Sequence, residues 1–270
     1  MIKKPLLGFF APFIIVIFLC WTSEVNASIV ILNGLTHENS IQPGSSYKGT
    51  INVQNSGNTV QNVKIYLRDY LFYHTGETKH DQPGSLERSN ASWISYSPEL
   101  LTLKPGELVS VNFEVSVPPD DSLKGTYWSV VMVEEVTPPD TSANRGSIKI
   151  NTSVRYAIQI ITNIGNTGRS DMEFVEFEMA VNEGRNILNV ALENTGERIL
   201  KPELNLELFD ESGNSTGIIK SDRRKMYPAT SIKSTLDLEG IKPGNYQGVL
   251  VVDCGEERLY GTNLSLEVKK

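Results

Sequence analysis

Apolar and polar residues alternate with a period of two along several stretches of this 270-residue chain. The clearest stretch, residues 108–117, reads LVSVNFEVSV, and such a period places every second side chain on one buried face of a β-strand. A Lys-Pro-Gly turn at 104–106 precedes this strand, and Pro118 and Pro119 end it because proline cannot donate to a sheet ladder. A second strand is predicted from Gly125. This order of turn, strand, crossover and strand is typical of the middle of an immunoglobulin-like sandwich.

The longest alternation follows a polar loop at 136–147 and covers residues 148–160. We expect it to be the final strand of a first domain, unusually long for a strand. Residues 163–168, NIGNTG, then read as the linker to a second domain. The apolar face of the predicted strand includes Ile148, Ile150, Val154 and Ile158, and the polar face includes Arg155.

The second half of the chain repeats the first. The segment INV followed by NSG at 51–57 recurs as LNV followed by NTG at 188–196. In the same order, GTYWSVVMV at 125–133 recurs as GNYQGVLVV at 244–252. Two copies indicate tandem domains and not a solenoid. No stretch has the period of a long amphipathic helix, so the predicted class is all-β, with two tandem immunoglobulin-like β-sandwiches at 28–165 and 166–270.

The first 27 residues have the features of a signal peptide. Lys3 and Lys4 precede an apolar run at 5–21, and Ala27 is the small residue that signal peptidase prefers. A retained membrane anchor is the alternative, because 17 apolar residues come close to spanning a bilayer, although Pro12 interrupts the run. We therefore expect an exported protein without a stable membrane span after cleavage, in the periplasm, in the cell envelope or secreted.

Charge and cysteine content narrow the classes of partner. Removal of residues 1–27 leaves 23 basic and 31 acidic side chains, a net charge of −8, which argues against nucleic acid. Cys254 is then the lone cysteine, so no internal disulfide supports the fold and a sizeable core must do so.

Candidate chemistry is sparse. The three histidines are predicted to lie in loops of the first half, and the chain has no His-Glu-x-x-His pair and no phosphate-binding glycine loop. His74, His80 and Asp81 are candidate metal ligands, but two histidines and one acid do not complete a tetrahedral site. We expect no catalytic residues, no metal and no cofactor, and hence a protein that is not an enzyme.

The aromatic residues are predicted to fill cores or corners. For Trp93 and Trp128 the alternative is a sugar-binding site, in which an exposed indole ring stacks on a sugar ring. Tryptophan is more often buried than displayed in such folds, so the sequence favours the core.

The order of these features resembles the two-domain periplasmic pilus chaperones. The resemblance lies in the Pro-Gly turn before residue 107, the strand from Gly125 to Glu134, the long last strand and the smaller second sandwich, and it covers nearly the whole mature chain. The resemblance implies that the last strand of domain one binds a partner by strand addition and donates alternate apolar side chains. The implied donors are Ile148, Ile150, Val154 and Ile158. The alternative is that this face packs into its own sandwich.

The same resemblance implies a basic anchor for the partner's terminal carboxylate. Arg155 lies on the polar face of the long strand, and its guanidinium suits a carboxylate. The family's second anchor, an arginine on the first strand, is missing, since Lys48 is the only basic residue between Ser28 and Thr50. The expected partner is a protein, a pilin-like or other extracytoplasmic subunit.

A weaker resemblance concerns residues 93–118, which look similar to Gram-positive cell-surface proteins with a peptidoglycan-binding immunoglobulin-like domain. The predicted function is therefore an exported, non-enzymatic chaperone-like or assembly factor that binds extended partner segments. The alternative is a surface or envelope module that recognises a wall polymer or a protein.

Overall fold

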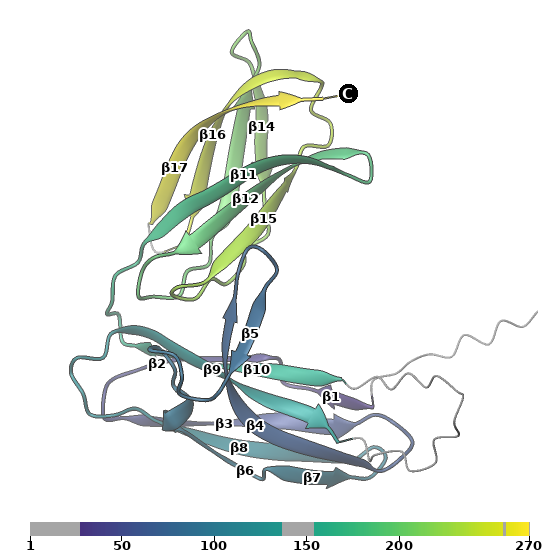
Figure 1. The fold of residues 1–270 in the computed structure, drawn as a ribbon, viewed down its shortest axis with the longest axis vertical. Helices are drawn as coiled ribbons and strands as arrows, with labels where there is room; N and C mark the ends of the chain where they lie inside the picture. Colours follow the sequence, from purple (N-terminus) through teal and green to yellow (C-terminus); the bar gives the residue numbers. More distant parts are fainter. Residues whose placement is uncertain (1–27, 137–153, 256–257, 270) are drawn as a thin grey trace, which may run out of the picture.

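The computed structural model describes residues 28–136, 154–255 and 258–269, and it confirms an all-β protein of two tandem immunoglobulin-like sandwiches (Figure 1). No helix among these residues is long and apolar enough to cross a membrane. The predicted signal peptide, most of the loop at 136–147, and Ile148 and Ile150 lie outside the described residues. The division at residues 165 and 166 stays a prediction.

The first sandwich packs two sheets face to face. One sheet has the order β1-β3-β8-β6, and the other has the order β2-β10-β9-β4-β5, with β7 also paired to β4. The elements are β1 (Ile29–Ile31), β2 (Thr36–Ile41), β3 (Ser46–Asn55), β4 (Gln61–Phe72), β5 (Thr78–Asp81), a 3-10 turn (Ala91–Trp93), β6 (Ile94–Ser97), β7 (Leu100–Leu103), β8 (Leu108–Ser116), β9 (Gly125–Glu135) and β10 (Arg155–Ile164).

The alternation that predicted β8 is confirmed in the core of this sandwich. Val111, Phe113 and Val115 are buried between the two sheets, as a period of two requires. Leu108 is also apolar and is the first residue of this strand. It lies one residue out of phase with the buried positions and is 50% exposed.

The second sandwich has the same construction. Its sheets have the orders β11-β12-β15 and β14-β13-β16-β17, and leucines of β13 meet the inner face of β12 in its core. The elements are β11 (Met172–Asn182), β12 (Arg185–Asn194), β13 (Glu203–Phe209), β14 (Ser215–Lys220), β15 (Ser231–Asp237), β16 (Gly244–Asp253) and β17 (Leu259–Val268).

The sequence repeat recurs as a repeated hydrogen-bond arrangement. In the first sandwich the buried amide of Asn55 donates to the carbonyls of Thr59 and Leu103 and accepts from the Gly57 N–H. In the second, the amide of Asn194 does the same with two carbonyls, those of Arg198 and Met226, and with the Gly196 N–H. Each asparagine thus closes the turn that follows its strand, β3 in the first sandwich and β12 in the second, and satisfies backbone groups that would otherwise be buried unpaired.

An aromatic joint connects the two sandwiches. Tyr227, from the connection between β14 and β15, stacks on Trp128 of β9 with ring centroids 4.9 Å apart and meets Phe72 of β4 edge-on at 5.6 Å. Both Trp128 and Tyr227 are buried. The prediction that Trp128 is buried is thus confirmed, although the partner that covers it is the second sandwich.

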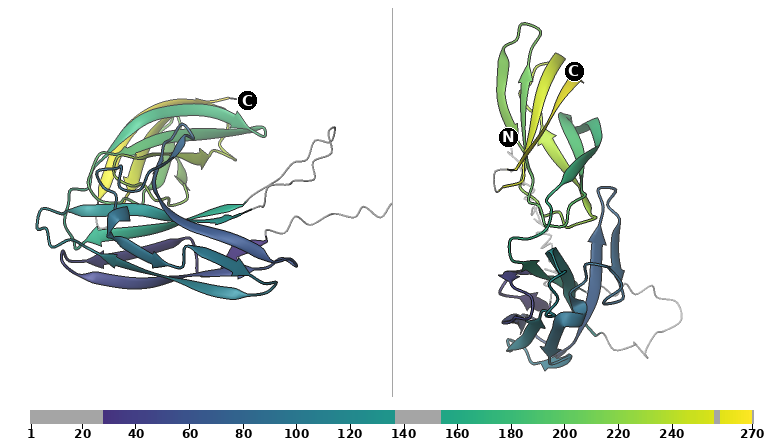
Figure 2. Two further views of the ribbon diagram at one scale, coloured as in Figure 1. Left: turned by 60° about the horizontal axis from the view of Figure 1, so that its bottom comes forward. Right: turned by 90° about the vertical axis from the view of Figure 1, so that its left-hand side faces the viewer.

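A hairpin made by β4 and β5 reinforces the joint. It rises from the first sandwich beside the second, as two views show (Figures 1 and 2). At its tip the backbone N–H of His74 donates to the hydroxyl of Ser231 at 3.0 Å, so the tip is bonded to the start of β15. Backbone bonds also join the sandwiches, because the Thr126 N–H donates to the Glu197 carbonyl at 2.8 Å. These contacts fix the angle between the sandwiches.

Candidate partner-binding site

The last strand of the first sandwich has an edge that is only half covered. On one side β10 pairs with β9 along its whole length, from Arg155 opposite Glu134 to Ile164 opposite Gly125. On the other side it pairs with β2 in parallel, but only from Gln159 onward. Within the described residues, no strand pairs with residues 155–158 on that side. Such an edge is a template for a further strand.

The direction of the backbone groups at this edge can be read from Gln159. Its N–H donates to the Leu35 carbonyl at 2.9 Å, so the backbone of Gln159 points toward the β2 side. Because backbone direction alternates along a strand, the N–H and C=O groups of Arg155 and Ala157 point to the same open side. Those of Tyr156 and Ile158 point to β9. The open edge therefore offers two donors and two acceptors.

The predicted partner-binding residues differ in how exposed they are in the structure. Ile158 has no exposed surface and belongs to the core cluster of the first sandwich. Val154 is half-buried just before β10 begins, and Arg155 is exposed. Their contact with a partner stays a prediction, as does that of Ile148 and Ile150, which are outside the described residues. As placed, the side chain of Ile158 holds β10 against its own core.

The outward face of β10 lines a cavity of about 570 Å³ on the sheet, here called the sheet-face cavity. Arg155 packs its guanidinium near Glu134, with Nε 3.7 Å from Oε1, and the Tyr66 hydroxyl donates to the same carboxylate at 2.6 Å. Arg68 lies 5.1 Å above the Tyr66 ring. The lining residues are Tyr66, Arg68, Tyr70, Thr78, His80, Met132, Arg155, Ala157 and Gln159.

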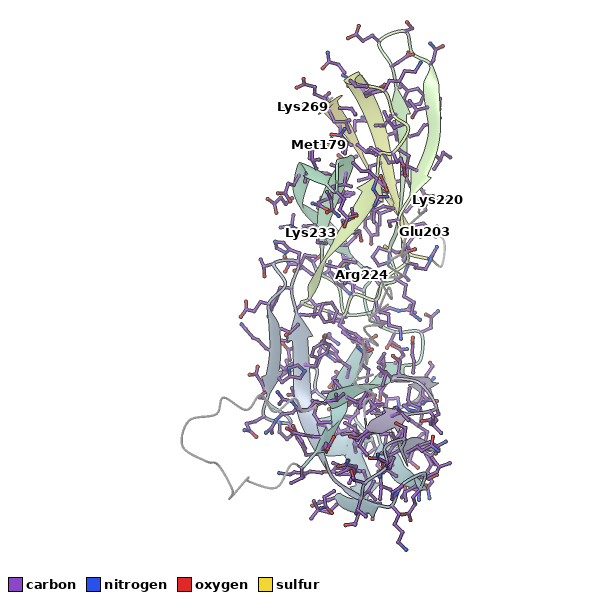
Figure 3. The ribbon with its side chains drawn as sticks, turned by 90° about the vertical axis from the view of Figure 1, so that its right-hand side faces the viewer. Met179, Glu203, Lys220, Arg224, Lys233 and Lys269 are labelled. Atoms are coloured by element: carbon purple, nitrogen blue, oxygen red, sulfur yellow. The ribbon has the colours of Figure 1, made fainter. Side chains whose placement is uncertain are left out.

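A second cavity of about 480 Å³ continues the first into the angle between the sandwiches and is here called the junction cavity. Tyr70, Thr78 and Gln159 line both cavities, so the two form one cleft. The second sandwich contributes Arg224, Lys225 and Lys233. Figure 3 shows Arg224 and Lys233 at the end of that sandwich that meets the first. The remaining lining residues are Phe72, Tyr73, His74, Gly76, Tyr227, Ser231 and Ile232.

Burial and positive charge shape the ionisation of the cleft. Desolvation lowers the pKa of His80, and the nearby guanidinium groups of Arg155 and Arg68 lower it further. Desolvation also lowers the pKa of Lys225, with Glu38 acting in the opposite direction. Burial raises the pKa of Tyr70, although Arg224 partly offsets this. The imidazole of His80 is thus kept neutral in a cleft whose charge comes from arginine and lysine.

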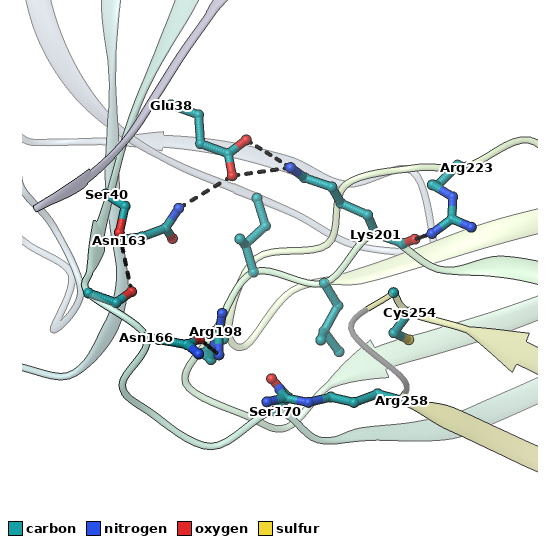
Figure 4. A pocket seen from close by; sticks show the side chains of 14 residues that line it. Glu38, Ser40, Asn163, Asn166, Ser170, Arg198, Lys201, Arg223, Cys254 and Arg258 are labelled. Atoms are coloured by element: carbon teal, nitrogen blue, oxygen red, sulfur yellow. Dashed lines mark hydrogen bonds and ion pairs between the residues drawn. The ribbon is translucent and has the colours of Figure 1, made fainter.

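A third cavity, of about 560 Å³, lies on the other side of the joint next to the linker (Figure 4). Its charges are already paired within the molecule, since Lys201 Nζ lies 3.0 Å from Glu38 and Arg223 lies between Glu203 and Asp253. Burial raises the pKa of the Cys254 thiol there to about 11, so the thiol stays protonated and unreactive at neutral pH. This cavity ties the second sandwich to the first and does not resemble a ligand site.

A contact between His74 and Ser231 brings together the residue types of a catalytic base and a nucleophile. The Nδ1 atom of His74 lies 3.0 Å from the Ser231 hydroxyl, the distance of a nucleophile and its base. Ser231 is only 3% exposed and its hydroxyl accepts the His74 backbone N–H at 3.0 Å, so this contact joins the hairpin tip to β15. Among the described residues, no group of three or more His, Cys, Asp or Glu side chains could hold a metal ion. His74 therefore has a structural role, because it links the β4–β5 hairpin to the second sandwich.

Sequence reasoning identified Arg155 but missed the other basic residues of the cleft. Arg68 and Arg224 are far apart in the sequence and come together only through the joint. One signal was available, because residues 125–133 are apolar almost without interruption. Such a run is typical of a strand buried on both faces, and it predicts that another part of the protein covers β9.

Comparison with known proteins finds similarity at the level of structure but not of sequence. No family model and no curated protein matches the chain. It is similar to the class 5 fimbriae chaperone CfaA at 14% identity, with 88% of this chain and 98% of that chain covered and a TM-score of 0.43. The YadV chaperone is 11% identical, with 88% of this chain and 100% of that chain covered and a TM-score of 0.43. The E. coli chaperone DraB is 13% identical, with 90% of this chain and 98% of that chain covered and a TM-score of 0.40. Because these TM-scores lie below 0.5, the function proposed next rests on the geometry of the chain itself.

Proposed function

We propose that this chain is an exported chaperone-like or assembly protein that binds an extended segment of another protein by strand addition at β10. The single observation that carries the proposal is the short register of β2, which leaves the backbone of Arg155 and Ala157 open at the edge. A partner strand would pair there through main-chain hydrogen bonds, which give affinity without requiring one particular sequence.

Arg155 is the proposed polar contact at this edge. Its side chain is exposed on the cleft side, and its 3.7 Å contact with Glu134 is long enough for a partner's carboxylate to compete for the guanidinium. The apolar residues predicted upstream, Ile148, Ile150 and Val154, would extend the contact along the same strand. Ile158 would support it from the core.

The proposed partner is a pilin-like or other extracytoplasmic subunit, and the proposed place is the periplasm or cell envelope. A surface module that recognises a wall polymer is the alternative. The structure gives that alternative no exposed tryptophan platform in its described part, because Trp128 is buried in the joint and Trp93 packs against Tyr127 at 4.7 Å. Strand addition is therefore the function that the geometry supports best.

The proposal is tested by removing one N–H group from the open edge. Proline at position 157 removes a donor that points away from β9, so Ala157→Pro should preserve the fold, as proline does on edge strands, and should block pairing with a partner. Ala157→Ser keeps the N–H and is the matched control. In an otherwise unaltered chain, a photo-crosslinker at position 157 first identifies the protein bound there. Capture of that protein by each tagged variant, purified from the envelope fraction, is then measured without the crosslinker. Equal capture by the proline and serine variants would refute strand addition at this edge.

Arg155→Ala provides an independent test of the polar contact. It removes an exposed side chain, so the melting temperature should hardly change, while capture of the crosslinked partner should weaken by about tenfold. If capture is unchanged, Arg155 does not belong to the site.

A further inference from the structure

The cleft differs sharply in charge from the protein as a whole. The full chain carries a net charge of −7, yet the sheet-face and junction cavities are lined by Arg68, Arg155, Arg224, Lys225 and Lys233. Of the described residues that line either cavity, none is acidic, although three of these cations pair with carboxylates outside the lining: Arg155 with Glu134, Lys225 with Glu38 and Lys233 with Glu178. A cluster of one sign inside a protein of the other sign focuses the local potential on a ligand of opposite charge.

Two of these cations lack a carboxylate partner within the described part of the chain. The Arg68 Nη1 atom donates to the Gln82 amide oxygen at 3.0 Å, and the Arg224 Nη1 atom donates to the Lys233 carbonyl at 2.7 Å. Neutral acceptors hold both guanidinium groups in place without neutralising them. The two groups lie in different sandwiches and line the two ends of the cleft.

The cleft also lies beside the open edge of β10. Arg155, Ala157 and Gln159 all point outward from the sheet and line the sheet-face cavity. A strand added at the edge would project every second side chain over that same face, at intervals of about 7 Å. Side chains of the partner at alternate positions would then lie over the face that carries Arg155, with Arg68 two strands further across the sheet on β4.

We propose, on the basis of the strand addition proposed above, that the captured segment is acidic, with carboxylates at alternate positions. Arg155, on the strand next to the partner, binds a carboxylate over the sheet, and Arg68 on β4 adds to the positive potential there. Arg224 and Lys225, supplied by the second sandwich, bind carboxylates that reach the junction. The second sandwich therefore contributes directly to the choice of partner.

The geometry favours a peptide over other polyanions. The open edge offers alternating N–H and C=O groups, which match a peptide backbone and neither a phosphate nor a sugar backbone. The net negative charge of the chain would also repel a long polyanion outside the cleft.

The test uses two dye-labelled peptides of one length, six repeats of Glu-Thr and six repeats of Gln-Thr, and fluorescence anisotropy at low salt. The acidic peptide should bind at least about tenfold more tightly, and the preference should shrink as salt is added. The double variant Arg224→Gln, Lys225→Gln should lose most of this preference. The single variant Lys242→Gln, in the turn at the opposite end of β15, is the control for a lost positive charge and should retain it.

Three results would overturn the proposal: equal binding of the two peptides, no binding of the acidic peptide, or displacement of the acidic peptide by heparin at lower concentration than by unlabelled peptide. The Ala157→Pro variant separates this failure from failure of strand addition. If the Gln-Thr peptide binds as well as the acidic one and proline at 157 abolishes both, strand addition stands and acid selection falls. If proline at 157 affects neither peptide, strand addition itself fails. Thermal melts confirm that each variant is folded.

Discussion

Tyr227 holds the two sandwiches at the angle that forms the cleft, and its substitution has a calculable cost. The side chain is 0% exposed, stacks on Trp128 and donates its hydroxyl to the Gln159 amide oxygen at 2.7 Å. Burial raises the pKa of this hydroxyl, so it stays a donor at any ordinary pH. Tyr227→Phe removes one partly buried hydrogen bond and should lower the free energy of unfolding by about 0.5–1.5 kcal/mol.

Tyr227→Ala removes the whole ring and leaves a cavity at the joint. Truncation of a buried large aromatic costs about 3–5 kcal/mol, and here the loss is concentrated between the sandwiches. Urea unfolding of a Trp93→Phe background, in which Trp128 is the only tryptophan after residue 27, reports on the joint directly. We expect the alanine variant to show two transitions and a broader distribution of particle sizes in small-angle X-ray scattering. A change below about 1 kcal/mol with unchanged scattering would show that the joint does not fix the angle.

Four further outcomes follow from the structure. Asn55→Ala and Asn194→Ala each remove the same three hydrogen bonds from a buried turn, so each should lower the free energy of unfolding by about 1–3 kcal/mol in urea titrations, and a loss in only one sandwich would contradict their equivalence. Gly49→Ala places a Cβ atom 2.3 Å from the buried Phe113 ring, so it should cost about 1–3 kcal/mol, and an unchanged melting temperature would show that the ring can move aside. Burial lowers the pKa of His37 in the folded protein below its ordinary 6.5, so the imidazole of the unfolded chain is protonated first as pH falls. The free energy of unfolding should therefore decline below about pH 6.5, until pH falls past the lower pKa of the folded state. His37→Gln should flatten this part of the pH–stability curve, and an identical slope in the variant would remove His37 as its source. Ile158→Asp buries a charge in the core and should unfold the first sandwich, whereas a folded variant that has lost partner capture would show that this face is donated.

The sequence was sufficient for the architecture because each sandwich strand carries its own evidence. Alternation identified β8, and the repeated Asn-x-Gly turns identified the duplication that the hydrogen bonds of Asn55 and Asn194 confirm. These are local patterns, set by residues a few positions apart. Because the pattern is local, it could not predict what covers the side chain of Ile158. Alternation shows which residues share a face of a strand, but not whether that face packs on the protein's own core or on a partner.

The cleft could not be predicted in this way. Arg68 and Arg155 belong to β4 and β10 of one sheet, whereas Arg224 belongs to the connection before β15, and the contacts of the joint, including the stacking of Tyr227 on Trp128, bring it to the same cleft. No spacing in the sequence encodes that arrangement, because it depends on the angle between two domains. The first strand lacks the second basic anchor that the resemblance to the pilus chaperones implies, and no pattern in the sequence points to the basic residues that the second sandwich contributes.

The most direct test of strand addition is amide hydrogen exchange at the edge of β10, comparing the free chain with the complex purified through a tagged copy. In the free chain the amides of Arg155 and Ala157 should exchange quickly because they face the open side, while those of Tyr156 and Ile158, which point to β9, should be protected. On capture of the partner, the amides of Arg155 and Ala157 should become protected as well. If they exchange at the same rate in the complex as in the free chain, the partner does not bind as an added strand.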